Sequence, residues 1–247
     1  MSRSPESAAV RWRVVLALAG AFAVFDTSAR LLGSDRGQAG VLVGVLVVGA
    51  LLAAEQLLLG EPMAGGLHRL GFGVPRGRAV GTALIVGALL LAVVPLYRSA
   101  TGATFEMYPG WAGLLPGLFA QAGLAEESLF RGFLFRRLRE GRTFWHAALV
   151  ASGPFVLVHL WLFVTLPWPI AAASVLLAVA ISFPFAHLFE LGGNTVWAPA
   201  LVHWVVQGTV KVLVWDDDGP GFAMTWMAAS AVVPYVAFVT RRRHHQA

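Results

Sequence analysis

Two adjacent glutamates and an arginine form the pattern Glu126-Glu127-x-x-x-Arg131 near one end of an apolar stretch. Successive residues of an α-helix point about 100° apart, so the two carboxylates cannot address the same point in space. Glu127 and Arg131 are four residues apart and can form an ion pair on one helix face. This pairing would leave Glu126 free to act as a general base towards water. A water-stabilised charge cluster at a helix end is the alternative interpretation of the same spacing.

Two histidines lie in other apolar stretches. His159 ends the pattern Phe155-x-x-x-His159, and His203 begins the pattern His203-x-x-x-Gln207. His203 and Gln207 share a helix face and can both donate hydrogen bonds to one point, as an oxyanion site requires. Polar side chains in apolar helices also serve as hydrogen-bonded contacts between helices, and this remains the alternative for all three residues.

A further polar pair, His187 and Glu190, lies three residues apart and close to Gly192-Gly193. Because a loop follows these residues directly, we expect a local pair at the membrane interface rather than a catalytic group.

The stretches that hold these residues are apolar enough to cross a membrane. Hydrophobic residues make up 57% of the 247 residues and charged residues only 13%, about half the share found in soluble domains. This number of charged residues is too small to form a polar surface. We therefore predict an all-α, polytopic transmembrane helical bundle in a single integral membrane domain, 1–247. At about 20 apolar residues per span, about eight spans are expected: 14–32, 39–59, 79–96, 111–135, 146–166, 169–188, 196–214 and 222–240.

The basic residues are distributed unevenly in this eight-span topology. The side of the two termini carries Arg3, Arg11, Arg13, Arg69, Arg76, Arg78, Arg131, Arg136, Arg137, Arg139, Arg142, Arg241, Arg242 and Arg243; the other side carries Arg30, Arg36, Arg98 and Lys211. Basic loops face the cytoplasm, so we expect a multi-pass protein of the cell (inner) membrane with both termini cytoplasmic. Residues 216–218 then form a solvated turn outside. Arginines that flank apolar spans also account for the net charge of +5, so nucleic-acid binding is not expected.

Taken together, the three patterns resemble the motifs of the CPBP family, the CAAX-protease and bacteriocin-processing membrane proteins, also called the ABI family. Phe130-Arg131-Gly132-Phe133-Leu134 resembles the continuation of the first motif, and residues 194–203 resemble the approach to the third. The resemblance covers about residues 110–215, which would form a protease-like core.

This resemblance implies a helical membrane fold with a cavity open towards the cytoplasm and a glutamic-type intramembrane endopeptidase. It implies that Glu126 activates water, that Glu127 and Arg131 complete the first motif, and that His159 and His203 are the catalytic histidines. Gln207 departs from the asparagine usual in the family, but it keeps the same amide on a longer side chain.

The chain leaves the use of a metal open. Two histidines and a carboxylate can bind a divalent cation such as Zn²⁺, and Glu126, His159 and His203 are the candidate ligands. The same groups can hold water without a metal. Cysteine is absent, which excludes a thiolate nucleophile and cysteine ligands, and the His-Glu-x-x-His zinc motif does not occur.

The predicted function is therefore an intramembrane endopeptidase that acts on a protein or peptide substrate within the lipid bilayer. The substrate would be a segment near the cytoplasmic leaflet: a prenylated CAAX-like C-terminus, a leader peptide or a C-terminal sorting signal. The departure at Gln207 favours one alternative, a non-proteolytic scaffold or immunity protein of the same fold. A small transporter is the other, but we find no repeat relating the two halves of the chain.

Overall fold

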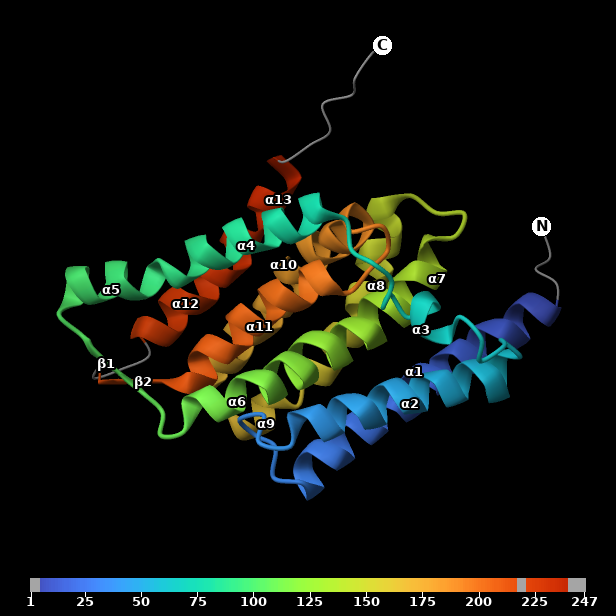
Figure 1. Cartoon of the computed structure of the whole chain (residues 1–247), viewed down its shortest axis with the longest axis horizontal. Helices are drawn as coiled ribbons and strands as arrows, with labels where there is room; N and C mark the ends of the chain where they lie inside the picture. The colour runs from blue at the N-terminus through green and yellow to red at the C-terminus, as the bar shows by residue number, and fades with distance from the viewer. Residues whose placement is uncertain (1–4, 217–220, 240–247) are drawn as a thin grey trace, which may run out of the picture.

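The computed structural model describes residues 5–216 and 221–239, which form an elongated bundle of helices (Figure 1). Predictions that concern Arg3, Asp217, Asp218 and residues 241–243 lie outside the described residues. The elements are α1 (Pro5–Leu31), α2 (Gly40–Leu59), α3 (Gly66–Arg69), α4 (Gly77–Leu91), α5 (Val93–Thr101), β1 (Thr104–Met107), α6 (Trp111–Leu118), η1 (Phe119–Ala125), η2 (Ser128–Phe135), α7 (Arg136–Arg139), α8 (Phe144–His159), α9 (Leu162–Thr165), α10 (Trp168–Leu191), α11 (Trp197–Val212), β2 (Leu213–Asp216), α12 (Gly221–Val232), η3 (Val233–Tyr235) and α13 (Val236–Val239). The all-α fold class is confirmed.

Six helical segments in the described part of the chain are long and apolar enough to cross a membrane: Trp12–Leu31, Gly40–Leu59, Gly77–Thr101, Phe144–Thr165, Trp168–Leu191 and Gly221–Val239. Their outer faces carry exposed leucines such as Leu84, Leu157 and Leu176, each at least 60% accessible. Large apolar side chains facing outward on this scale are expected only where lipid rather than water surrounds the helices. The chain is a multi-pass membrane protein.

Two of the expected spans, 111–135 and 196–214, are not among these six segments. The first divides into α6, η1 and η2 and carries charged residues, whereas the helix of the second, α11, has only 16 residues. Both lie in the interior of the bundle, where α11 packs against α4, η1 and α10 (Figure 1). Because neighbouring helices surround them, these two segments need neither the length nor the apolar surface that contact with lipid requires.

The turns of the chain collect at two ends of the bundle (Figure 1). The strand end holds α5, α9 and the antiparallel pair β1–β2, in which Thr104 lies opposite Asp216 and Met107 opposite Leu213. The arginine-rich end holds α3, α7 and the first turns of α4 and α8. Among residues 12–216 and 221–239, the arginines that lie there are Arg13 of α1 and Arg69, Arg76, Arg78, Arg136, Arg137, Arg139 and Arg142.

A buried glutamate ties the arginine-rich end together. The Glu55 carboxylate, on α2, accepts hydrogen bonds from Arg69 Nε at 3.1 Å and from Arg137 Nη2 at 2.6 Å. A carboxylate removed from water requires such partners, so this cluster fixes α2 against α3 and α7.

The polar pair expected at the same end has contacts with other elements. Glu190 pairs with Arg139 at 2.7 Å, and the ring of His187 stacks on Phe238 with centroids 4.4 Å apart. α7 thus brings an arginine to Glu190 from a distant part of the sequence, and the expected pairing of His187 with Glu190 stays a prediction.

Glycine permits the closest approach in the interior of the bundle. A Cβ on Gly132 would overlap the carbonyl oxygen of Leu70, so η2 lies directly against the backbone that follows α3. We expect Gly132→Ala to destabilise the protein by about 1–3 kcal/mol, because backbone cannot move aside as a flexible side chain can. Thermal unfolding in detergent measures the effect. Gly113→Ala is the control, since no atom lies within 4 Å of a Cβ there. Equal melting temperatures for the two variants would contradict the packing argument.

Candidate active site

The two adjacent glutamates lie between two π-helical stretches, Phe119–Ala125 and Ser128–Phe135. A π-helical turn is rare, and it is frequently found at functional sites because it changes the direction of the side chains that follow it. The regular helix expected over 111–135 is therefore interrupted on both sides of Glu126 and Glu127. The two carboxylates differ in their surroundings: the Glu127 side chain is completely buried, whereas that of Glu126 is 12% exposed.

Glu127 is the centre of a buried charge cluster. Its Oε1 accepts a hydrogen bond from Arg131 Nη1 at 2.9 Å, as the four-residue spacing predicted. The same oxygen lies 2.7 Å from His203 Nδ1 on α11. A carboxylate oxygen can only accept, so Nδ1 carries the proton and donates it. Arg131 and His203 are as deeply buried as Glu127, with 3% and 1% of their side chains exposed.

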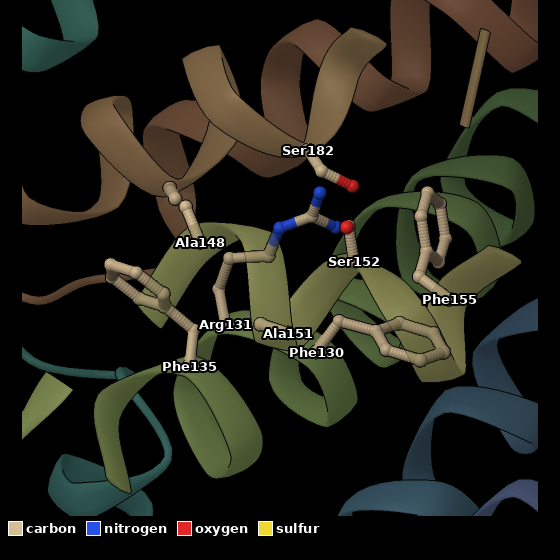
Figure 2. A pocket seen from close by; sticks show the side chains of 9 residues that line it. Phe130, Arg131, Phe135, Ala148, Ala151, Ser152, Phe155 and Ser182 are labelled. Carbon is tan, nitrogen blue, oxygen red and sulfur yellow. The ribbon is translucent and has the colours of Figure 1, made fainter. Parts of the chain in front are cut away.

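Aromatic rings surround the cation of this cluster. The Arg131 guanidinium lies 5.0 Å from the ring centroid of Phe155 and 5.2 Å from that of Phe185. Figure 2 shows the guanidinium extending from η2 towards Ser152 and Ser182. The cavity around it, about 10 Å³, has room for about one water molecule. The positive charge is therefore held by one carboxylate and by the faces of aromatic rings.

Glu126 faces a different set of groups. Gln207 Nε2 donates to Glu126 Oε1 at 3.3 Å and lies 3.0 Å from His203 Nε2. The remaining close contact joins His203 Nε2 and Glu126 Oε2 at 3.6 Å. An amide nitrogen can only donate, so His203 Nε2 accepts from Gln207. His203 thus connects the two glutamates, with Nδ1 on Glu127 and Nε2 facing Gln207 and Glu126.

His159 lies at the end of α8 and apart from this network. Its Nδ1 is 2.7 Å from the carbonyl oxygen of Phe155, to which it donates, and its ring packs on Phe155 with centroids 4.7 Å apart. Among the residues that the structure describes, no hydrogen bond or ion pair joins His159 to Glu126. The fold thus brings together Glu126, Glu127, Arg131, His203 and Gln207, while His159 is linked to this group by the cavity that it lines together with His203 and Gln207.

That cavity has a volume of about 390 Å³, typical of a site for a small ligand or a short peptide segment. Its walls are mostly apolar. The lining residues are Phe155, His159, Leu162, Leu166, Ile170, Ser174, Leu177, Ala178, Ile181, His203, Val206, Gln207, Val210, Lys211, Trp215, Ala223, Trp226 and Met227. Trp226 is held by its Nε1, which donates to the carbonyl oxygen of Val206 at 2.9 Å.

Two residues of the site were missed in the sequence. Lys211 lines the cavity four residues after Gln207, so the spacing that placed His203 and Gln207 on one face could have found it. Phe185, which packs against both Arg131 and His203, follows no pattern that would distinguish it from other apolar residues of its helix.

The expected metal ligands do not converge on one point. In the part of the chain that the structure describes, no three His, Asp or Glu side chains are placed to hold a metal ion. Both histidines use Nδ1 for a protein acceptor, which leaves Nε2 of each ring as the possible metal ligand. Glu126, His159 and His203 are nevertheless not grouped around one point, so a cation held by all three is not supported by their placement.

Comparison with known proteins identifies one family. Residues 108–209 match the model of the family described as type II CAAX prenyl endopeptidase Rce1-like. No curated protein and no solved structure matches the chain. The resemblance inferred from the three motifs is thereby confirmed over this segment, which contains every residue of the cluster around Glu127.

The charge cluster leads to a prediction on stability. Arg131→Ala should lower the free energy of unfolding by about 3–5 kcal/mol, because it leaves Glu127 buried without its cation. Adding Glu127→Gln to Arg131→Ala should recover part of the loss. Arg139→Ala is the matched control: its partner Glu190 is 30% exposed, so we expect about 0–1 kcal/mol. Folded protein recovered in detergent and its melting temperature provide the measurement. Additive effects of Glu127→Gln and Arg131→Ala would show that the two charges are not coupled.

Proposed function

We propose that this membrane protein is an endopeptidase in which Glu126 activates a water molecule for attack on a peptide bond. The observation that carries the proposal is the division of labour between two adjacent carboxylates. Glu127 is occupied by Arg131 and His203, whereas Glu126 is partly exposed and its close polar contacts, among the residues that the structure describes, are with the amide of Gln207 and Nε2 of His203. The family match agrees with a protease, since the name of that family describes an endopeptidase.

The first step is proton transfer to Glu126. The carboxylate accepts a proton from a bound water as the water oxygen attacks the carbonyl carbon of the substrate, and the carbonyl oxygen becomes an oxyanion. When the tetrahedral intermediate collapses, the C–N bond breaks and Glu126 returns the proton to the leaving amine. One carboxylate thus acts first as base and then as acid, and no covalent enzyme intermediate is needed.

The oxyanion would be stabilised by Gln207 and His203, which lie on the same face of α11. Gln207 can donate through its amide N–H without any change of protonation. His203 can donate from Nε2 only if it carries a second proton, since Nδ1 already donates to Glu127. Glu127, whose Oε1 lies 2.7 Å from Nδ1, would act on the reaction through His203 by holding its ring in place.

His159 has a positioning role in this scheme. It lines the cavity together with His203 and Gln207, but the direct contacts of Glu126 are with those two residues. We assign His159 to the binding of water or of the substrate backbone inside the cavity, at a distance from the proton transfer itself.

A protein segment with apolar side chains suits the walls of the cavity. A prenylated C-terminus, a leader peptide and a C-terminal sorting signal all meet this description. The uneven distribution of arginines supports a location in the cell membrane with both termini in the cytoplasm. The protease-like core of about residues 110–215 would form one domain with the rest of the chain.

The competing proposal is a non-proteolytic scaffold of the same fold. Its support is that Gln207 stands where the family usually has asparagine. The position of the Gln207 amide, within hydrogen-bond reach of both Glu126 and His203, supports the enzyme instead. The longer side chain still presents its donor to the two groups that would flank the reacting carbonyl.

Glu126→Gln should abolish cleavage while the protein stays folded. The amide has nearly the same shape but cannot accept a proton, and loss of a general base costs about 10²–10⁴-fold in rate. The assay uses protein reconstituted in liposomes with membrane peptides encoded by the neighbouring genes. Glu106→Gln is the control, because Glu106 is exposed on β1 and away from the site. A rate equal to wild type for Glu126→Gln would exclude the catalytic assignment, and a wild type that cleaves none of these peptides would favour the scaffold.

Gln207 provides a second test in the same assay. Gln207→Ala should lower kcat about 10²–10³-fold with little change in KM, because the donor acts on the oxyanion and not on the bound substrate. Gln207→Asn should keep substantial activity, and Gln207→Glu should be poor because a carboxylate repels the developing charge. Thr209→Val is the control on the same helix, since its hydroxyl bonds only to the carbonyl oxygen of Val205. If Gln207→Ala turns over like wild type, the residue serves only as a contact between helices.

A further inference from the structure

The cavity beside the catalytic groups extends in only one direction. On α11 its lining runs from His203 to Lys211, about 12 Å along the helix axis towards the strand end. On α10, which begins at the strand end, the lining residues fall between Ile170 and Ile181, within the first 14 of its 24 residues. The lining residues of α12 lie between Ala223 and Met227, again in its first turns from the strand end.

The other elements that line the cavity also contribute residues near the strand end. α8 contributes Phe155 and His159, which lie in its last turns, and α9 contributes Leu162. Trp215 of β2 and Leu166, which follows α9, complete the cavity at the strand end itself. Every element thus lines the cavity with the part that lies towards the strand end.

Towards the arginine-rich end, buried side chains fill the space beside His203. Beyond His203 towards the arginine-rich end lie the buried Arg131 guanidinium and the rings of Phe155 and Phe185, which pack on both sides of it. The space left around these groups holds about one water molecule (Figure 2). A peptide segment therefore cannot reach Glu126 from the arginine-rich end without dismantling the charge cluster.

The number of basic and acidic residues at each end of the bundle indicates which end faces the cytoplasm. Among residues 12–216 and 221–239, eight arginines and four acidic residues lie at the arginine-rich end, the acidic ones being Glu55, Glu61, Glu140 and Glu190. The strand end has four basic residues, namely Arg30, Arg36, Arg98 and Lys211, and four acidic ones, namely Asp26, Asp35, Glu106 and Asp216. An excess of arginine marks the cytoplasmic side.

We propose that the substrate enters the catalytic cavity from the strand end, and hence from the non-cytoplasmic half of the membrane. The occupant is an apolar segment of an exported or outer-leaflet membrane protein, whose scissile bond reaches Glu126 after passing Lys211 and Trp215. This inference rests on the proposed function for the identity of the occupant. It reverses the expectation, drawn from the family resemblance, of a cavity open to the cytoplasm and a substrate near the cytoplasmic leaflet. Of the three substrate classes that suit the cavity walls, it excludes a prenylated C-terminus that lies in the cytoplasm.

The absence of cysteine from the chain allows a direct test by single-cysteine labelling. The cavity variants are Ser174→Cys and Ala223→Cys, on α10 and α12, both partly accessible positions on the cavity wall. Ser99→Cys reports the strand end and Ala64→Cys the arginine-rich end, and both positions are exposed. Intact cells that express each full-length variant are treated with a membrane-impermeant maleimide, with and without permeabilisation, and the cysteine-free wild type measures the background.

We expect Ser99→Cys, Ser174→Cys and Ala223→Cys to be labelled to the same extent in intact and permeabilised cells. Ala64→Cys should be labelled only after permeabilisation. The proposal is overturned if both cavity cysteines follow Ala64→Cys, if they stay unlabelled under both conditions, or if Ser99→Cys and Ala64→Cys exchange their behaviour. Labelling requires no cleavage, so its outcome is independent of the outcome for Glu126→Gln.

Discussion

A single carboxylate oxygen, Oε1 of Glu127, holds the site together. It accepts hydrogen bonds from Arg131, four residues away on the same segment, and from His203, which is 76 residues away on α11. Burying an ion in a membrane protein is costly unless its partners are in place, so these three side chains fix the register between η2 and α11. Because Glu127 Oε2 has no partner in the described structure, all the pairing of this carboxylate passes through one atom.

This constraint separates the roles of two neighbouring residues of the same type. Glu127 is committed to the cluster, and the angle between adjacent residues on the helix then directs Glu126 towards Gln207, which lines the cavity. The same cluster fixes the proton of His203 on Nδ1, which leaves Nε2 facing Gln207 and Glu126. The contacts of Glu127 therefore both stabilise the buried pair with Arg131 and leave Glu126 available for chemistry.

The two segments that carry the site are those least suited to face lipid. The segment from α6 to α7 is interrupted by π-helical turns and carries charges, and α11 is short. Both are stabilised by close packing in the interior of the bundle instead. Gly132 lies against the backbone of Leu70, and Gly123 lets η1 approach Ala200 on α11. Apolar helices around them form the surface that meets the membrane, so polar groups can occupy the interior without exposure to lipid.

The sequence by itself determined the membrane class, the pairing of Glu127 with Arg131, the shared face of His203 and Gln207, and the family resemblance. Each of these depends on composition or on residues at most four positions apart, which helical geometry relates directly. Tertiary structure decided the contact of Glu127 with His203, the separation of His159 from Glu126, the partner of Glu190 and the direction in which the cavity extends. These features depend on which faces of distant helices meet, and packing across the bundle selects those faces where local spacing leaves several arrangements open.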